Sequence, residues 1–287
     1  MSDFIGTKLT MNLGERSYDI IVKRGSLENL YQFARLDRRV AVVTDSGVPA
    51  QYAQMVADQC KDATIITVPQ GEASKSFKIL ETVLRQMLDF GMGRGDLVVA
   101  VGGGVVGDLA GFAASIYMRG IDFINCPTTT LSMIDSSIGG KTAVDLGDTK
   151  NIVGAFWQPK LVIVDPDTLS TLPRRHFING LAEAIKAGLL ADPELFSIFE
   201  KEDVDDRIGD IICRSLRFKK SIVEQDETEQ GMRKALNFGH TIGHGIEAVK
   251  GIKGRRTTGL FHGECVALGM LPMIESKALQ KRVRGVY

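Results

Sequence analysis

The sequence predicts an α/β N-terminal domain with a mostly parallel sheet, followed by an all-α C-terminal domain. Two observations support this prediction. Over the first 170 residues, short apolar strand patterns alternate with helical patterns, which is typical of a parallel sheet covered by helices. Beyond Pro173 the β-branched runs disappear and helical patterns dominate. A length of 287 residues suits two domains, and we expect them to cover residues 1–170 and 171–287.

The expected strands are short apolar and β-branched runs in the first domain. Within residues 7–23, two strands flank a turn at Gly14-Glu15. A further strand, Arg39–Thr44, is apolar enough to be buried and ends at Asp45. The other strands are expected at Ala63–Val68, Leu97–Val101, Ile121–Cys126 and Leu161–Val164.

The expected helices have apolar residues at helical spacing. In the first domain, Ser74–Phe90 is amphipathic, and Ser74 can cap its first turn. In the second domain, we expect helices over Pro173–Leu190, Pro193–Glu200, Arg207–Glu224, Gly239–Lys250 and Glu264–Arg282.

The composition excludes several classes of protein. The 35 Lys and Arg residues balance the 35 Asp and Glu residues, which argues against a general binder of nucleic acid or of a membrane surface. The four cysteines are far apart and form no CxxC pair, so neither a disulfide framework nor a cysteine-rich zinc module is expected. The first residues include Asp3 and form no apolar segment, so we expect no signal peptide, and no uncharged stretch reaches the length of a membrane helix, about 18 residues. We expect a cytoplasmic protein.

A glycine-rich segment, Gly102–Asp108, directly follows the strand Leu97–Val101. Glycines let the backbone approach a ligand closely, and the N-terminus of the next helix attracts a phosphate. The spacing matches GxGxxG, but this pattern usually follows the first strand, and here several strands precede it. The segment favours a dinucleotide or phosphate site, and a tight strand–helix turn is the alternative.

A second polar segment, Asp135–Thr142, contains Gly139-Gly140-Lys141-Thr142. It differs from a P-loop because residue 135 is Asp where the pattern requires Gly, so a nucleoside triphosphate site is not expected. With Lys150-Asn151 it places two lysines and an asparagine on expected loops. These side chains suit an anionic substrate. Solvated loop lysines are the alternative.

The histidines gather in the helical half, where His240, His244 and His262 lie within 23 residues of one another. His240 and His244 are four residues apart, so they face one side of a helix. Two histidines and a carboxylate, with one position left open, are typical of a catalytic zinc site. Glu183 is the candidate carboxylate because it lies among Ala and Leu, with Lys186 one turn later. A surface His pair and a surface Glu–Lys pair are the alternative.

Arg233 and Asn237 are also four residues apart and lead into His240, and Lys219 and Lys220 lie on the preceding helix. Taken alone, these residues are more often a solvated face than a binding site.

The order of the motifs is more specific than any one of them. The motifs are Gly102–Asp108, Tyr117–Gly120, Pro127–Thr129, Asp135–Thr142, Lys150-Asn151, Asn179–Lys186, Asn237–His244 and Phe261–Glu264. Together they resemble the 3-dehydroquinate synthases of the sugar-phosphate cyclase group, from about residue 10 to the end. The resemblance implies NAD on the N-terminal domain and a divalent metal, usually zinc, in the cleft between the domains. Cobalt is a possible replacement for zinc.

The resemblance also implies a set of site residues. The metal ligands would be Glu183, His240 and His262. The contacts to NAD would be Asp45, Glu72, Lys75, Gly103, Gly104, Val105, Asp108, Thr128, Thr129, Lys141, Lys150, Thr168 and Thr171. The residues around the substrate would be Asp135, Lys141, Lys150, Asn151, Lys186, Lys219, Arg233, Asn237 and His244. Arg119 would reach the substrate of the neighbouring subunit in a homodimer.

The implied reaction converts 3-deoxy-D-arabino-heptulosonate 7-phosphate to 3-dehydroquinate and phosphate, a step of the shikimate pathway to aromatic amino acids. The enzyme would be a carbon–oxygen lyase. NAD oxidises a ring hydroxyl, phosphate leaves by β-elimination, NADH returns the hydride, and an aldol closure forms the product. NAD is regenerated, so no second redox substrate is required.

Three other functions stay open. A sister cyclase would act on a different sugar phosphate, a metal-dependent polyol dehydrogenase would release NADH, and an inactive remnant would only bind NAD. The family continues beyond its HGE segment and supplies another substrate lysine, whereas this chain stops 25 residues after His262. We therefore expect the helical domain to be truncated, with complete cofactor sites but weak turnover.

Overall fold

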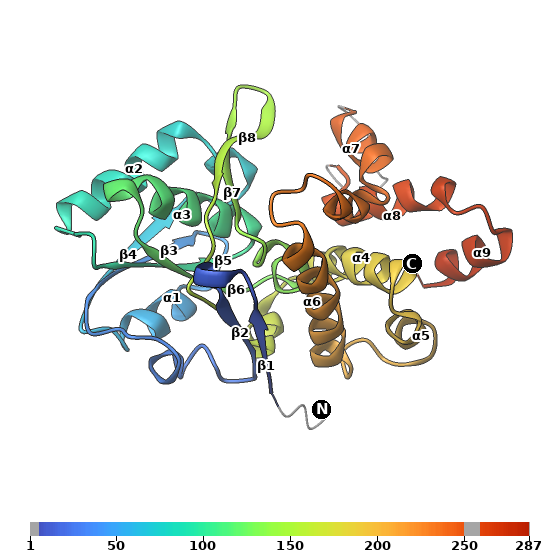
Figure 1. Cartoon of the computed structure of the whole chain (residues 1–287), viewed down its shortest axis with the longest axis horizontal. Helices are drawn as coiled ribbons and strands as arrows, with labels where there is room; N and C mark the ends of the chain where they lie inside the picture. The colour runs from blue at the N-terminus through green and yellow to red at the C-terminus, as the bar shows by residue number, and fades with distance from the viewer. Residues whose placement is uncertain (1–5, 250–258, 287) are drawn as a thin grey trace. The chain divides into compact units, whose positions relative to one another are not determined.

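The computed structural model describes residues 6–249 and 259–286. The chain divides into two compact units, the first ending at Leu172 and the second beginning at Pro173. Figure 1 colours the first unit from blue to yellow-green and the second from yellow to red. Among the described residues, no helix combines the length and the apolar character needed to cross a bilayer.

The first unit is built on a seven-stranded sheet with the order β1-β2-β9-β6-β5-β3-β4. Only β1 runs antiparallel to its neighbour, and all the other pairs are parallel. The alternation of strand and helix signals correctly predicted this mostly parallel sheet. The strands are β1 (Thr7–Met11), β2 (Tyr18–Val22), β3 (Arg39–Asp45), β4 (Asp62–Val68), β5 (Leu97–Gly102), β6 (Asp122–Pro127) and β9 (Leu161–Val164).

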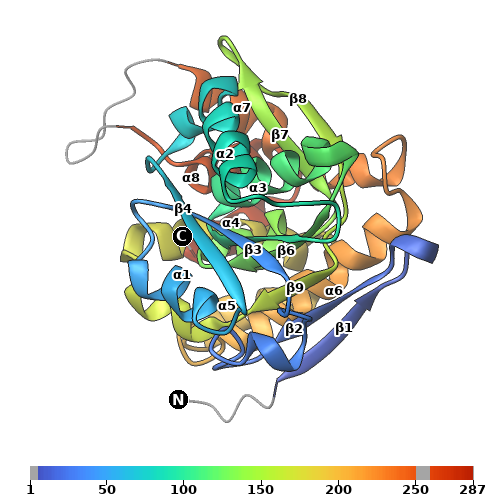
Figure 2. The same ribbon diagram turned by 90° about the vertical axis from the view of Figure 1, so that its left-hand side faces the viewer.

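Both faces of the sheet are buried under helices. Ala41 and Val43 of β3 belong to one apolar cluster together with helices α2 and α3, whereas Val40 and Val42 pack in another together with α1. Successive side chains of a strand point to opposite faces, so a strand covered on both sides is apolar throughout. Figure 2 shows α2 and α3 on one side of the sheet and α1 on the other. These helices are α1 (Ala50–Ala57), α2 (Phe77–Asp89) and α3 (Gly104–Ile116).

The helix expected over Ser74–Phe90 begins later than the sequence suggested. Helix α2 begins at Phe77, and its cap is Ser76, whose Oγ accepts the Ile79 N–H at 3.4 Å. Ser74 instead ends a short 3₁₀ helix and donates its hydroxyl to the Pro69 carbonyl. The choice follows the backbone, because Ser76 has the extended conformation that an N-cap requires.

A β-hairpin formed by β7 (Lys141–Leu146) and β8 (Thr149–Phe156) makes a separate two-stranded sheet. The sequence analysis placed Lys141, Lys150 and Asn151 on loops, and this was wrong, because all three lie on these strands. The two strands are joined through Gly147-Asp148, a two-residue connection typical of hairpins, which was the local signal that could have revealed them.

The hairpin is stabilised by packing on α3. Val144, Val153 and Ala155 pack in the apolar cluster that also contains much of α3. Gly111 of α3 makes the close approach possible, since a Cβ there would lie 2.5 Å from Thr142 Cγ2. Because this packing joins segments that are distant in the sequence, the residue pattern of β7 and β8 alone predicts these strands only weakly.

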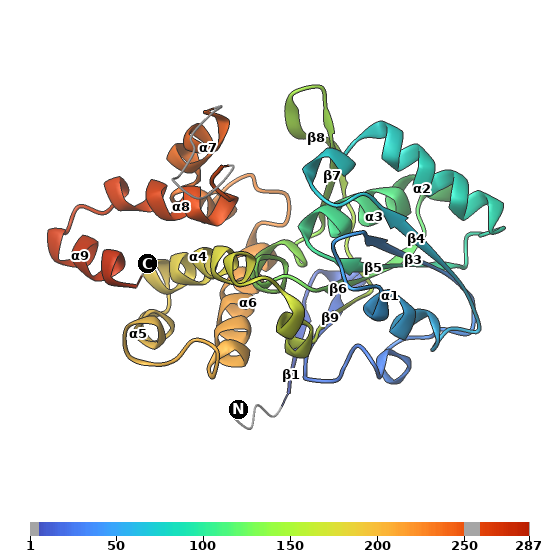
Figure 3. The same cartoon turned by 180° about the vertical axis from the view of Figure 1, so that it is seen from behind.

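The described part of the second unit consists of helices, as the sequence predicted. They are α4 (Arg174–Leu190), α5 (Pro193–Lys201), α6 (Ile208–Gln225), α7 (His240–Ala248), α8 (His262–Met270) and α9 (Lys277–Gly285), and Figure 3 shows them from behind. Asp192 caps α5 by accepting the Leu195 N–H at 3.0 Å and also pairs with Arg214 at 2.9 Å. Desolvation opposes the ionised carboxylate, but these hydrogen bonds outweigh it and hold the pKa of Asp192 below its usual value.

The single helix expected over Glu264–Arg282 is wrong. Helix α8 ends at Met270, a 3₁₀ turn follows over Leu271–Met273, and α9 begins at Lys277. Pro272 lies in that turn, and proline has no N–H to continue an α-helix. Ser276 then caps the new helix by accepting the Leu279 N–H at 3.3 Å.

Candidate functional site

The glycine segment joins the end of β5 to the start of α3. Gly103 is the N-cap of α3 and Gly104 is its first residue. A Cβ on Gly103 would lie 3.1 Å from Thr129 Cγ2, and one on Gly104 would lie 3.0 Å from Ser136 Oγ. The backbone at the start of α3 therefore lies close to the Thr129 and Ser136 side chains. Because residues 103 and 104 are both glycine, no side chain covers the N–H groups of this first helical turn. Such a turn suits a pyrophosphate.

Other residues expected to contact NAD follow neighbouring strands at the same edge of the sheet. The Thr128 N–H donates to the Gly102 carbonyl at 2.9 Å, immediately after β6. Asp45 ends β3, and its Oδ1 accepts the Gly47 N–H at 2.7 Å. The 3₁₀ helix Pro166–Thr171 follows β9, and its Thr171 Oγ1 lies 3.0 Å from the Tyr52 hydroxyl. Because β3, β5, β6 and β9 are parallel, their carboxyl ends form one edge, where ligands bind in folds of this class.

A buried lysine, Lys75, joins three other predicted site residues. Lys75 is only 4% exposed, and its Nζ lies 2.7 Å from Asp108 Oδ2. The same Nζ donates to Asn151 Oδ1 and lies 3.9 Å from Glu72 Oε1. A buried ammonium needs such partners to offset its desolvation. Three residues expected to contact NAD and one expected to contact substrate therefore form one network.

Asp145 belongs to this network, although the sequence analysis did not single it out. It lies at an irregularity in the β7–β8 register, and its N–H donates to the Lys75 carbonyl at 2.8 Å. Its Oδ1 accepts the Asn151 N–H at 2.7 Å. Asn151 has a φ of +55°, a conformation that asparagine tolerates better than most residues. Asp145 thus ties the hairpin to the segment before α2 and holds Asn151 in this conformation.

Two other predicted substrate residues lie in unusual backbone. Asp135 is part of a π-helix over Ser132–Ser136, a rare form that often accompanies functional sites. Arg119 is exposed, and both it and Met118 have positive φ, at +71° and +50°. Left-handed non-glycine residues cost free energy and concentrate at functional sites.

In the second unit, Glu183 and Lys186 form a buried ion pair on α4, each of them 3% exposed. The alternative of a surface Glu–Lys pair therefore does not hold. The Lys186 Nζ also donates to the Leu236 carbonyl at 2.7 Å, which ties α4 to the segment before His240.

His240 and His262 both turn Nε2 toward Glu183. The distances to Glu183 Oε1 are 3.3 Å from His240 and 3.8 Å from His262. Each Nδ1 has an acceptor of its own: Glu247 Oε2 lies 3.2 Å from His262 Nδ1, and the Phe238 carbonyl lies 3.3 Å from His240 Nδ1. Acceptors of this kind orient the histidine ligands of metal sites.

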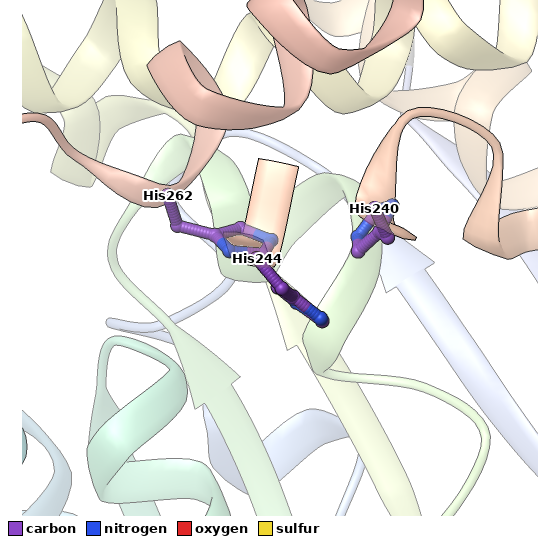
Figure 4. Close-up of side chains that lie close together, drawn as sticks. All are labelled: His240, His244 and His262. Carbon is purple, nitrogen blue, oxygen red and sulfur yellow. The ribbon is translucent and has the colours of Figure 1, made fainter. Parts of the chain in front are cut away.

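His244 lies one turn after His240 on α7. Figure 4 shows the rings of His240, His244 and His262 close together, and one nitrogen of each lies within 4.8 Å of the others. Imidazole nitrogens with a buried carboxylate are a donor set that suits zinc or a similar divalent ion. The residues therefore fit the expected metal, with Glu183, His240 and His262 facing one another and His244 beside them.

The remaining predicted substrate residues of this unit differ in burial. Arg233 is 2% exposed and donates to the Glu227 carbonyl, and Lys219 is 8% exposed, so neither belongs to a solvated face. Asn237 is exposed and lies 3.4 Å from Glu229 Oε1 through its Nδ2. Because Met232–Asn237 is a 3₁₀ helix with three residues per turn, the four-residue spacing of Arg233 and Asn237 does not stack them on one face.

Comparison with known proteins identifies the family. Residues 65–179 match the family model described as 3-dehydroquinate synthase N-terminal, and residues 180–284 match the one described as 3-dehydroquinate synthase C-terminal. The chain is 44% identical to a 3-dehydroquinate synthase of Pelobacter propionicus over 276 residues, which cover 92% of this chain and 76% of that protein. The chain belongs to the 3-dehydroquinate synthase family. A 3-dehydroquinate synthase of Streptococcus mutans gives the same identity and the same coverage.

Solved structures agree with this family assignment. A 2-deoxy-scyllo-inosose synthase, complexed with carbaglucose-6-phosphate, NAD+ and Co2+, matches with a TM-score of 0.87 and 26% identity over 98% of this chain and 81% of that one. A 2-epi-5-epi-valiolone synthase from Streptomyces hygroscopicus, with NAD+ and Zn2+ bound, has a TM-score of 0.83 and 29% identity over 96% of this chain and 81% of that one. These relatives of the synthase family share the fold found here.

Two residues to which sequence reasoning assigned no role lie on α4, the helix of Glu183. Arg175 donates to both carboxylate oxygens of Glu264, at 2.7 and 2.8 Å. These hydrogen bonds lower the pKa of Glu264. Asn179 is buried, and its Oδ1 accepts the Gly263 N–H at 2.7 Å. The four-residue steps from Arg175 to Asn179 to Glu183 were the available signal, because such steps follow one helix face.

Proposed function

We propose that this chain converts 3-deoxy-D-arabino-heptulosonate 7-phosphate to 3-dehydroquinate and phosphate, with NAD and a divalent metal as cofactors. The observation that carries the proposal is the buried Glu183 facing Nε2 of both His240 and His262. Family membership supplies the substrate class. We infer that the first unit binds NAD and the second binds the metal, as expected for domains over residues 1–170 and 171–287.

The chain's residues have distinct roles in this proposal. When bound, NAD would take up and return a hydride, and the metal would polarise the oxygen being oxidised. Glu183, His240 and His262 would hold the metal, with Glu247 and the Phe238 carbonyl orienting the two imidazoles. The ion pair between Lys75 and Asp108 would stabilise the start of α3, where the pyrophosphate of NAD is proposed to bind.

The substrate carries a carboxylate and a phosphate, roughly three negative charges in all. The cationic side chains proposed to balance them are Lys141, Lys150, Lys186, Lys219 and Arg233, with Arg119 contributed by a second subunit. Asp135, Asn151, Asn237 and His244 would orient its hydroxyl groups. The homodimer and the cytoplasmic location stay predictions.

The decisive experiment measures phosphate release from the heptulosonate phosphate by the purified chain with NAD and Zn2+. We expect release that stops with a chelator and returns with added metal, without net accumulation of NADH. Steady NADH formation from a polyol would favour the dehydrogenase. Phosphate release from another sugar phosphate alone would favour a sister cyclase. NAD binding without turnover of any of these substrates would favour an inactive remnant.

Asp145 provides a further test, because it holds Asn151 by one hydrogen bond. Replacing Asp145 with alanine removes the acceptor for the Asn151 N–H. The lost hydrogen bond contributes about 1–2 kcal/mol of free energy to holding Asn151 in place. We expect KM for the heptulosonate phosphate to rise about tenfold. Asp145→Asn keeps an acceptor oxygen and should retain a KM close to that of the parent. If the two variants have the same KM, the hydrogen bond does not position Asn151.

A further inference from the structure

One face of α4 carries more than the metal ligand. Arg175, Asn179 and Glu183 follow one another at four-residue steps within this helix, so they project from the same face. Glu183 faces the two histidines, whereas the other two residues contact the chain immediately around His262. His262 is the first residue of α8, so the position of its ring depends on how this helix terminus is held.

Arg175 binds the residues on both sides of His262. Its guanidinium makes a two-point contact with Glu264, at 2.7 and 2.8 Å, and lies 3.9 Å from the centre of the Phe261 ring. Glu264 in turn accepts the Phe261 N–H at 2.8 Å. His176 stacks on the same ring, with centroids 4.7 Å apart. Two-point arginine–carboxylate contacts fix orientation as well as distance.

Asn179 fixes Gly263, the residue that follows His262 in the chain. Its Oδ1 accepts the Gly263 N–H at 2.7 Å, and the side chain is only 7% exposed. Glycine is required at residue 263, because a Cβ there would lie 1.9 Å from the Asn179 carbonyl oxygen. Helices α4 and α8 therefore meet backbone to backbone beside His262.

We propose that Arg175 and Asn179 are positioning residues that hold His262 in the geometry required for metal binding with Glu183. Their hydrogen bonds run to Glu264 and to the Gly263 N–H, and neither residue is among those assigned to the metal or to the substrate. Their anchors lie at Phe261, Gly263 and Glu264, so the residue between them has little freedom to move away from α4. The proposal rests on the proposed function, because it takes Glu183 and His262 as ligands of one metal ion.

The test measures metal affinity rather than turnover. Chelator-treated protein is titrated with Zn2+ by calorimetry, and the absorption spectrum of the Co2+ form reports the coordination geometry. Asn179→Ala and Arg175→Lys are each expected to weaken Zn2+ binding about 10- to 100-fold, the usual effect of losing a residue that orients a ligand, and to change the Co2+ spectrum. Asn179→Asp keeps an acceptor oxygen and is expected to bind Zn2+ within a few-fold of the parent.

Arg174→Ala is the matched control. Arg174 is the neighbouring residue on α4, where it pairs with the exposed Asp205 at 2.5 Å and lies over Phe177. The Arg174→Ala substitution removes an arginine from the same helix turn, but the contacts it removes do not involve α8. Zn2+ affinity should therefore not change. NAD affinity and the thermal stability of the metal-free protein are measured for every variant, to exclude general unfolding.

The outcomes separate this proposal from the proposed function. His262→Ala is titrated in parallel. If His262→Ala loses Zn2+ while Asn179→Ala and Arg175→Lys bind it like the parent, the positioning role is wrong and the ligand assignment holds. If His262→Ala also binds Zn2+ normally, the ligand assignment itself fails. Equal losses in Asn179→Ala and Asn179→Asp, or a comparable loss in Arg174→Ala, would overturn the positioning role.

Discussion

Replacing His262 with alanine is expected to remove the bound metal and to stop turnover. Catalytic zinc is held by three protein ligands with one position left open, so two remaining ligands bind it poorly. His262 Nε2 lies 3.8 Å from Glu183 Oε1, and its Nδ1 is oriented by Glu247. Losing only an orienting partner costs about 10- to 100-fold in affinity, and losing the ligand itself should cost more. Elemental analysis of the purified variant measures the loss directly.

His244→Ala is the informative companion to this variant, because His244 lies in the same group of histidines. We expect it to keep the metal and to lose turnover, since His244 is assigned to the substrate. Glu183→Gln should lose the metal as His262→Ala does. Full occupancy in His262→Ala would contradict the ligand assignment, and complete metal loss in His244→Ala would make His244 a ligand.

Replacing Gly104 with valine is expected to abolish NAD binding. Gly104 is the first residue of α3, where the free N–H groups point toward the expected pyrophosphate. An added Cβ alone would lie 3.0 Å from Ser136 Oγ, and the two methyl groups of valine would extend further into the space beside the helix terminus. Calorimetry with NAD is expected to give no measurable heat of binding. The metal site should stay intact, because all of its residues lie in the second unit.

The control is Gly95→Ala, a glycine in the loop before β5 where an added Cβ would meet no atom within 4 Å. It should bind NAD like the parent. Circular dichroism and thermal unfolding of both variants separate a blocked site from a misfolded unit. NAD affinity equal to that of the parent in a folded Gly104→Val protein would place the dinucleotide elsewhere.

The sequence predicted elements whose signals are local. The strand Leu97–Val101 is buried on both faces, and its apolar run shows this directly. Two of the errors in the element pattern concern the residue at which a helix begins or ends. Ser74 and Ser76 are both plausible caps, and only the extended backbone at Ser76 decides between them. Pro272 ends a helix whose apolar spacing continues past it, and its missing N–H could have been weighed from sequence.

The candidate site likewise contains some features that local sequence signals predict and others that they do not. The glycine turn after β5 is a local feature, and so is a glutamate set among alanine and leucine, because burying a carboxylate is costly without partners. The burial of Glu183 and its pairing with Lys186 agree with that physical argument. The order of the motifs added the family, which no single motif specified.

Only the tertiary structure decided which distant residues meet. Asn179 and Gly263 are 84 residues apart, and Lys75 and Asn151 are 76 apart, yet each pair shares a hydrogen bond. Local periodicity shows which face of a helix or strand is apolar, but not which other element that face will meet. A hydrogen bond needs its two atoms within about 3 Å, and that distance is set by the packing of whole elements. The sequence by itself therefore determined the kinds of element, the glycine turn and the candidate ligands. The packing of α4 on α8, and of the β7–β8 hairpin on α3, decided which residues hold them in place.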